Sequence, residues 1–424
     1  MYEKELAAYF EAHKDEFLED LAVLVAIPSV KTEPSGDCPY GRNTAKALSQ
    51  SLSIAEKYDL YTENWENYVA IVQIEPGRRM LDILAHLDVV APGDGWEVTK
   101  PYTMKISEGK VYGRGICDDK GPTILSLYAL KALVEAGKLK DKRVRLIVGG
   151  DEESGAWVCM KRYRETEELP VCAFSPDGDY PATYAEKGIM HVTVSRDLDA
   201  SVAPLTLEGG KTYNIVPAFA KAEFNGKTYE SEGKAAHASR PELGINATRE
   251  LCKKLAADGV DHPFVKLMKI ADTEGWGIDF EDEPSGKLTL NPAISVVTPT
   301  HAEVKCDLRV PVTYKPEDVT AAINKTLAPL GFKAECDFVL GSLYVPKDSE
   351  LVTTLQRVYK DCTGRDEQPI SVGGGTYART FENAVAFGPL LPGEENTNHK
   401  TNECWDYSNM LLTYQIIANV MEQL

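Results

Sequence analysis

The sequence lacks the features that would direct its function to a nucleic acid, a membrane or a disulfide framework. Its nine cysteines are odd in number and scattered, with no Cys-x-x-Cys pair, so we expect free thiols in a reducing cytoplasm and no thiolate zinc site. Basic residues are outnumbered 46 to 65 by acidic ones, and the formal net charge of -19 repels nucleic acids and anionic membranes. No apolar run approaches the roughly 20 residues that span a bilayer, and no secretion leader precedes the first helix pattern. We therefore expect a cytoplasmic protein without nucleic-acid or membrane partners.

The length and apolar content predict two domains. At 424 residues and 43% hydrophobic residues, the chain exceeds the usual size of a single core. Residues 81–90 and 143–150 have the apolar composition of buried strands, and residues 121–136 have the apolar spacing of a helix. This alternation is typical of an α/β fold, here a mixed, mostly parallel sheet covered by helices.

The pattern of apolar and polar residues changes near residue 187. Segments such as 303–310 alternate apolar and polar residues like half-exposed antiparallel strands, and helix patterns at 246–257 and 316–327 lie between such segments. After residue 366 the buried-strand character returns. We therefore predict a catalytic domain formed by residues 1–186 and 366–424, interrupted by an inserted α+β lid domain at residues 187–365.

Five potential metal ligands, far apart in the sequence, each lie in a short phrase suited to a metal site. They are His86, Asp118, Glu153, Asp177 and His399. Two imidazoles and three carboxylates suit two divalent ions, with zinc favoured over manganese or cobalt. Taken singly, the phrases have ordinary readings: a hydrogen-bonded buried histidine, a helix N-cap or a solvated acidic loop. Because several follow predicted strands, where sites of open α/β sheets collect, we expect them to converge.

Neighbouring carboxylates supply the chemistry that a hydrolase needs. Asp88 is two residues from His86 on a predicted strand, so it faces the same side and can orient the imidazole. Asp118 lies in a glycine-rich turn before a helix, which can present a carboxylate that bridges two ions. Glu152 and Glu153 are adjacent, so their side chains diverge. We expect Glu153 to bind metal and Glu152 to act as general base and acid toward a metal-activated water.

Several phrases together resemble a known enzyme family. These are the residues around His86, Gly-Arg-Gly-Ile-Cys-Asp-Asp-Lys-Gly-Pro at 113–122, Asp-Glu-Glu-Ser-Gly at 151–155 and Ser-Pro-Asp-Gly at 175–178. In this order they are similar to the aminoacylase/carnosinase family of dinuclear zinc peptidases, and within it to the peptidase V type of bacterial dipeptidase. The resemblance implies one metal held by His86 and Asp177, another held by Glu153 and His399, and Asp118 bridging both. It also implies a cis peptide bond after Asp118, with Asp88 and Glu152 as catalytic carboxylates that do not bind metal.

The resemblance extends to the inserted domain. It implies that His237, in Ala-Ala-His-Ala-Ser, stabilises the oxyanion of the tetrahedral intermediate, and that Asn214 and Arg309 bind the carboxylate of the substrate. The glycine-rich phrase at 373–379 matches the peptidase V pattern, which suggests backbone contacts to substrate from Gly374, Gly375 and Thr376. The segment 187–365 is shorter than the lid domain of a peptidase V and longer than the simple dimerising lid domains of the related acylases and carboxypeptidases. The sequence therefore leaves a monomer and a homodimer open.

The function predicted from these residues is hydrolysis of short, unblocked peptides by a metal-dependent dipeptidase. An N-acyl-amino-acid amidohydrolase would use the same dinuclear site and differs in accepting an acyl group in place of a free amine. The glycine-rich phrase and Asp-Asp-Lys-Gly-Pro favour the dipeptidase. A peptide-binding or metal-storage protein without turnover is the alternative from another class, and the presence of every required catalytic position argues against it.

Overall fold

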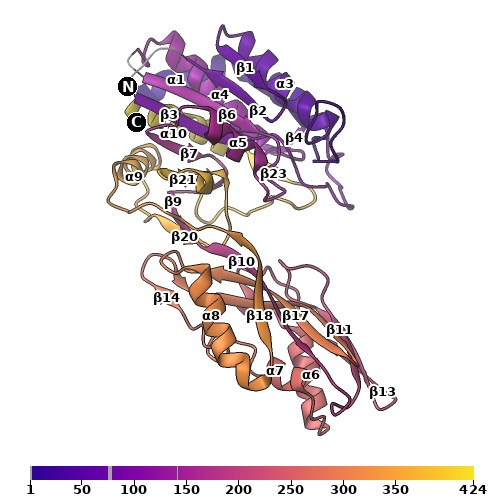
Figure 1. The fold of residues 1–424 in the computed structure, drawn as a ribbon. Coiled ribbons are helices and arrows are strands. Elements are labelled where there is room, and N and C mark those ends of the chain that lie inside the picture. The colour runs from indigo at the N-terminus through magenta and orange to yellow at the C-terminus, as the bar shows by residue number, and fades with distance from the viewer. Residues whose placement is uncertain (1, 75–78, 141) are drawn as a thin grey trace. The chain divides into compact units, whose positions relative to one another are not determined.

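A computed structural model describes residues 2–74, 79–140 and 142–424, which form two compact units (Figure 1). The first unit contains residues 1–184, 345–370 and 376–424, and the second contains residues 185–344 and 371–375. Within the described ranges, no helix combines the length and apolar composition needed to cross a bilayer. All nine cysteines are free, in keeping with the expected thiols.

The first unit is built on a mixed sheet whose strands have the order β1-β2-β6-β3-β7-β21. The strands are β1 (Tyr61–Trp65), β2 (Val69–Gln73), β3 (Arg79–His86), β6 (Lys142–Gly149), β7 (Cys172–Ser175) and β21 (Ala384–Ala386). The central neighbours β6, β3, β7 and β21 are parallel, whereas β1 and β2 are antiparallel additions. The predicted mixed α/β sheet is confirmed, and its parallel centre brings the carboxyl ends of three strands to one edge.

Helices pack around this sheet because each carries an apolar face. They are α1 (Tyr2–Ala12), α2 (Lys14–Val25), α3 (Arg42–Glu56), α4 (Lys120–Glu135), α5 (Val158–Thr166), α9 (Glu350–Thr363) and α10 (Tyr407–Gln423). Helix α4 is buried along almost its whole length and contacts α2, α10 and β3, so its first turn is held firmly beside the sheet. Smaller elements complete the unit: β4 (Lys105–Ser107), β5 (Lys110–Tyr112), β8 (Gly178–Asp179), η3 (Tyr377–Thr380), β22 (Pro389–Leu390) and β23 (Cys404–Asp406).

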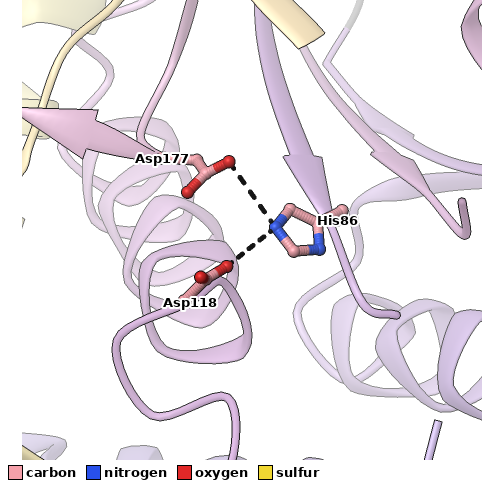
Figure 2. A group of neighbouring side chains, drawn as sticks. All are labelled: His86, Asp118 and Asp177. Atoms are coloured by element: carbon pink, nitrogen blue, oxygen red, sulfur yellow. Dashed lines mark ion pairs between the residues drawn. The ribbon is translucent and has the colours of Figure 1, made fainter. Parts of the chain in front are cut away.

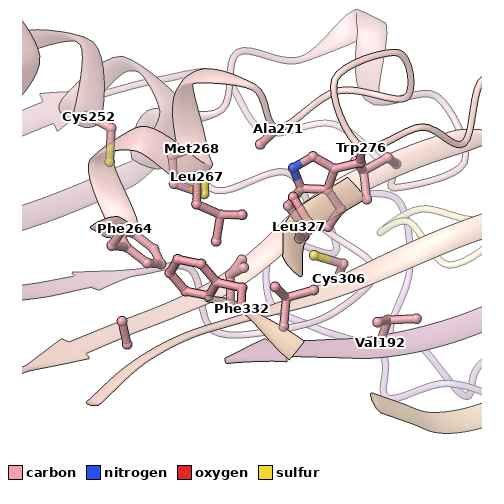
Figure 3. Close-up of a cluster of buried hydrophobic side chains, with 14 of the residues drawn as sticks. Val192, Cys252, Phe264, Leu267, Met268, Ala271, Trp276, Cys306, Leu327 and Phe332 are labelled. Atoms are coloured by element: carbon pink, nitrogen blue, oxygen red, sulfur yellow. The ribbon is translucent and has the colours of Figure 1, made fainter. Parts of the chain in front are cut away.

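The second unit has an antiparallel sheet of order β13-β12-β11-β16-β17-β10-β18. Its strands are β10 (Gly188–Asp197), β11 (Leu205–Gly209), β12 (Phe219–Phe224), β13 (Lys227–Glu232), β16 (Thr289–Thr298), β17 (His301–Val310) and β18 (Lys333–Leu340). Helices α6 (Ala247–Ala257) and α8 (Pro316–Leu327) coincide with the predicted helix patterns within one residue, whereas α7 (Pro263–Lys269) was not predicted. Alternate strand residues such as Val192 and Cys306 pack with Phe264, Trp276 and Leu327 in a buried apolar core (Figure 3).

The remaining short elements are strands β9 (Thr183–Glu186), β19 (Leu343–Tyr344) and β20 (Ile370–Val372), which follow β21 in the nine-stranded sheet: β9 pairs with β21, and β19 and β20 pair with β9. Strands β14 (Glu281–Asp282) and β15 (Gly286–Lys287) pair with each other, and η1 (Pro241–Leu243) and η2 (Ala328–Leu330) are short 3-10 helices.

The second unit has different bounds from the inserted segment 187–365 expected from sequence. It ends at Tyr344, because the amphipathic helix α9 buries one face against α10 of the first unit. Residues 371–375, the start of the glycine-rich phrase, return to the second unit, where Lys187 N donates to the carbonyl of Val372 at 3.0 Å. The sequence analysis assigned residues 350–363 to the inserted segment, and the apolar face of α9 instead joins the core of the first unit.

Candidate metal centre

The parallel strands of the first unit deliver three acidic or imidazole side chains to one edge of the sheet. His86 is the last residue of β3, Glu153 follows the end of β6, and Asp177 follows the end of β7. Since β3 pairs in parallel with both β6 and β7, these strand ends lie side by side. This is the edge at which open α/β sheets bind their ligands.

Asp118 reaches the same edge from the turn before α4. Gly113 and Gly115 have φ values of 152° and 87°, and a Cβ at Gly115 would approach the side chains of Lys120 and Val89 too closely. Asp119 is the N-cap residue of α4, and its Oδ2 accepts from the amide of His86 at 3.1 Å. The cis peptide bond that the resemblance implied lies between Asp118 and Asp119.

His86, Asp118 and Asp177 form the first candidate group (Figure 2). Nε2 of His86 lies 3.1 Å from Oδ1 of Asp118 and 3.6 Å from Oδ2 of Asp177. This nitrogen is buried and has no hydrogen bond of good geometry within the described part of the chain. Nδ1, on the other side of the ring, lies 2.9 Å from the carbonyl oxygen of Asp88, an arrangement that leaves Nε2 facing the two carboxylates.

Asp118, Glu153 and His399 form the second candidate group. Nε2 of His399 lies 2.9 Å from Oδ2 of Asp118 and 3.1 Å from Oε2 of Glu153. His399 is on a loop with a left-handed φ of 64°, and its side chain is 54% exposed. The two groups therefore share Asp118, which turns Oδ1 toward one histidine and Oδ2 toward the other.

The Asp88 side chain serves both the imidazole and the backbone of the two glutamates. Although β3 ends at His86, Oδ1 of Asp88 lies 3.5 Å from Nδ1 of His86, in keeping with the expected orienting contact. The carboxylate also accepts from the amides of Glu152 and Glu153, each at 3.0 Å, and the main-chain carbonyl of Asp88 lies 2.9 Å from the same ring nitrogen. Asp88 thus fixes the backbone of both glutamates and helps to orient His86.

The Glu152 carboxylate makes no hydrogen bond or ion pair with any other residue that the structure describes. Burial and the negative charge of Asp177 raise the pKa of Glu152 well above its usual range. A carboxyl group with a raised pKa can both accept and return a proton near neutral pH. Burial and the charge of Asp118 likewise raise the pKa of Glu153, to about 7.

The clustered carboxylates stabilise positive charge on the two neighbouring histidines. Burial alone would lower the pKa of His86, but Asp118, Asp177 and Asp88 reverse that effect and raise it well above the usual range. For His399, Asp118 and Glu153 outweigh burial and raise the pKa to about 11. Burial would raise the pKa of Asp118, yet the neighbouring imidazoles of His399 and His86 lower it. The raised pKa values of both imidazoles indicate that the carboxylates favour positive charge at the positions where divalent cations would fit.

The other sequence-predicted residues lie in the second unit. His237 is exposed, and its Nδ1 lies 2.7 Å from Oγ of Ser239. The carbonyl of Asn214 accepts from the amide of Ala238 at 2.9 Å, so the loops bearing Asn214 and His237 are neighbours. In Arg309, Nε and Nη2 donate to the two carboxylate oxygens of Asp307 at 2.7 and 3.0 Å. Asp307 already accepts the pair of hydrogen bonds expected for a substrate carboxylate.

The glycine-rich phrase is divided between the units. Gly374 and Gly375 belong to the second unit, and a Cβ at Gly374 would meet nothing within 4 Å. Nη1 of Arg309 donates to the carbonyl of Gly373 at 2.6 Å. Thr376 caps η3 in the first unit, and Tyr377 packs edge-on to His86, with 6.2 Å between ring centroids.

Sequence analysis did not identify Asp119, Glu403 or Tyr377 as parts of the site. Glu403 is completely buried and accepts hydrogen bonds from the loop that carries Asp118. One signal was present in the sequence: a charged Arg114 between two glycines in an otherwise apolar environment requires a buried acid. Nothing in the local pattern showed that this acid lies 289 positions away, at Glu403.

Several known proteins similar to this chain are named as peptidases or dipeptidases. Residues 83–423 match the family described as Peptidase family M20/M25/M40. The chain is 32% identical to the Bacillus subtilis protein named "Putative dipeptidase YtjP", with 97% of each chain covered. Among solved structures, human carnosine dipeptidase 1 matches with a TM-score of 0.64 at 15% identity, covering 100% of this chain and 99% of that one. Bacillus subtilis YXEP, described as a dinuclear metal-binding peptidase of the M20 family, matches with a TM-score of 0.55 at 15% identity and coverage of 97% and 98%.

Proposed function

Because the chain belongs to peptidase family M20/M25/M40, we propose that it is a metal-dependent dipeptidase that hydrolyses short peptides with a free amino terminus. The observation that carries the proposal is the position of Asp118, whose two carboxylate oxygens each face a different histidine. One carboxylate can thus serve two ions. The name of the YtjP relative supports the choice of a dipeptidase within this peptidase family.

The donor set fits two divalent ions. Each group joins one imidazole to carboxylates, with ligand atoms within 4.8 Å of one another. His86 Nε2 is a buried nitrogen without a hydrogen bond among the described residues, so coordination would satisfy it. We propose that His86 and Asp177 hold one ion, that Glu153 and His399 hold the other, and that Asp118 bridges them. Nitrogen with oxygen ligands suits zinc, and also manganese or cobalt.

Two ions bound there would polarise the scissile carbonyl and lower the pKa of a water molecule toward neutrality. We assign to Glu152 the removal of a proton from this water as its oxygen attacks the carbonyl carbon. The same carboxyl group would return that proton to the leaving amine as the carbon–nitrogen bond breaks. The carboxylate of Asp88 keeps the amides of Glu152 and Glu153 fixed during both steps.

For the second unit we keep the roles that the resemblance implies. His237 would donate to the developing oxyanion, and Asn214, with the amides of Gly374, Gly375 and Thr376, would contact the substrate. Arg309 would bind the carboxylate of the substrate, because Asp307 and the Gly373 carbonyl take three of its five N–H groups and leave one each on Nη1 and Nη2. The nine free thiols support the proposal that the protein acts in the cytoplasm.

A substrate panel separates the dipeptidase from the N-acyl-amino-acid amidohydrolase. Metal-stripped protein, reconstituted with zinc, manganese or cobalt, would be assayed on free dipeptides and on their N-acetylated forms by following amino acid release. We expect faster hydrolysis of the free series. Faster hydrolysis of the blocked series would favour the amidohydrolase, and no hydrolysis with any of the three metals would contradict both functions.

Metal addition is expected to raise the melting temperature of the metal-free protein. Ions that bind only the folded chain stabilise it by mass action, by about 2.7 kcal/mol at 100 times the Kd for one site. They would also relieve the repulsion among the clustered carboxylates of the site. Calorimetry with zinc should show a rise of several degrees, whereas magnesium, which prefers oxygen-only octahedral sites, should have little effect. Equal melting temperatures with and without zinc would contradict the proposed site.

A further inference from the structure

The carboxylate of Glu403 is the common acceptor for the loop that presents Asp118. Oε2 accepts from Nη1 of Arg114 at 2.7 Å and from the amide of Gly115 at 3.0 Å. Oε1 accepts from the amides of Cys117 and Asp118 at 3.0 and 3.4 Å. The carbonyl of Glu403 also accepts from the amide of Gly113 at 3.0 Å. Five donors from residues 113–118 thus converge on one buried residue.

Arg114 supplies the positive charge that the buried carboxylate of Glu403 requires. Its side chain is 1% exposed, and its Nη2 lies 3.5 and 3.4 Å from the carbonyls of Ala91 and Pro92. The guanidinium also lies 5.5 Å from the ring centroid of Trp96. A buried carboxylate is tolerated only when paired and hydrogen-bonded, and here the cation and the backbone amides together meet that requirement.

Glu403 also belongs to the segment that carries a ligand of the other group. It follows His399 by four residues and directly precedes β23, which pairs with β5 just before the glycine-rich turn. Thr397 closes the intervening loop, because its Oγ1 donates to the carbonyl of Cys404 at 2.9 Å and accepts from the Cys404 amide at 3.1 Å. One residue therefore connects the backbone supporting Asp118 to the backbone supporting His399.

We propose that Glu403, paired with Arg114, is a positioning residue that sets the affinity of both metal ions by fixing the backbone from which Asp118 reaches them. The inference rests on the proposed dinuclear site. Glu403 does not contact the ions. It holds the amide of Asp118, and any shift of that backbone displaces both carboxylate oxygens at once, so the two ions should lose affinity together.

The decisive variant is Glu403→Gln, which keeps the size of the side chain. The amide of glutamine has one oxygen, whereas the donors of residues 114–118 now bind two carboxylate oxygens. Its NH₂ group would face an N–H donor, and Arg114 would lose its counter-charge. Partners that orient metal ligands typically contribute about 10- to 100-fold in metal affinity. We expect a loss of this size for both zinc ions in competition with a chromophoric chelator, and an altered visible absorption spectrum of the cobalt-loaded protein.

The matched control is Asp82→Asn, which removes a buried carboxylate that pairs with Arg145 through two hydrogen bonds of 2.7 Å. It should lower the melting temperature while leaving zinc affinity and the cobalt spectrum unchanged. If Glu403→Gln lowers only the melting temperature, Glu403 is merely structural and the inference is wrong. If Glu403→Gln does not fold, Arg114→Lys replaces it: weaker zinc binding would support the inference, and unchanged binding would overturn it.

The unsubstituted protein tests the proposed function separately. Zinc binding without dipeptide hydrolysis would contradict the peptidase while leaving the comparison between Glu403→Gln and Asp82→Asn valid. Dipeptide hydrolysis together with unchanged affinity in Glu403→Gln would contradict only the role of Glu403. Absence of zinc binding by the unsubstituted protein would overturn both.

Discussion

Replacement of Glu152 by glutamine should reduce dipeptide turnover about 10³-fold, within the 10²- to 10⁴-fold range of general acid–base catalysis, while both metal ions stay bound. The amide occupies the same space as the carboxyl group but cannot accept the proton of the attacking water. The Glu152 carboxylate has no hydrogen bond or ion pair with another described residue, so its replacement should disturb little else. Steady-state kinetics with metal analysis by mass spectrometry would measure both quantities.

The control for this variant is Glu165→Gln on the exposed surface of α5, which makes the same change of charge in the same unit. It should retain full turnover. Undiminished kcat in Glu152→Gln would remove Glu152 from the mechanism. Loss of kcat together with loss of metal would instead show that Glu152 contributes to binding the ions.

Replacement of Asp118 by asparagine should abolish activity because it weakens the binding of both metal ions. Asparagine presents one oxygen and one NH₂ group where two oxygens face His86 and His399 at 3.1 and 2.9 Å. Loss of a ligand should exceed the roughly 10- to 100-fold loss typical of residues that only orient ligands. Titration calorimetry with zinc would report both binding steps.

The informative comparison is Asp177→Asn, because Asp177 belongs to only one of the two groups. This variant should strongly weaken the binding of one ion. The binding of the other ion, which depends on Glu153 and His399, should be largely unchanged. If Asp118→Asn also affects only one step, Asp118 does not bridge, and the two ions do not share a ligand.

The sequence predicted part of the convergence, because three of the ligands were tied to recognisable elements. His86 lies in the predicted strand 81–90, Glu153 follows the predicted strand 143–150, and Asp118 lies in a glycine-rich turn before a predicted helix. The strand β7 before Asp177 was not predicted. His399 lies in a loop after β22, and only the renewed strand character after residue 366 and the resemblance indicated that it returns to this edge.

The side-chain partners were harder to predict, because they depend on where an element ends. The sequence placed Asp88 beside His86, where its Oδ1 lies 3.5 Å from Nδ1, but it did not indicate that the same carboxylate also accepts from the amides of Glu152 and Glu153. It also did not indicate that Asp307 pairs with Arg309. The pairing of Arg114 with Glu403 joins distant positions, and no periodicity in the sequence records it.

The position of β21 has a consequence for the order in which the protein matures during synthesis. This strand is parallel to β7, yet residues 384–386 leave the ribosome some 200 residues after it. A nascent chain ending at Tyr184 already contains His86, Asp118 and Asp177, but neither β21 nor His399. Pairing across such a separation is slow to form. The proposed ligands His86, Asp118 and Asp177 are therefore synthesised well before His399, which is close to the C-terminal end of the sequence. We expect loading of the second ion to be a late step of biogenesis.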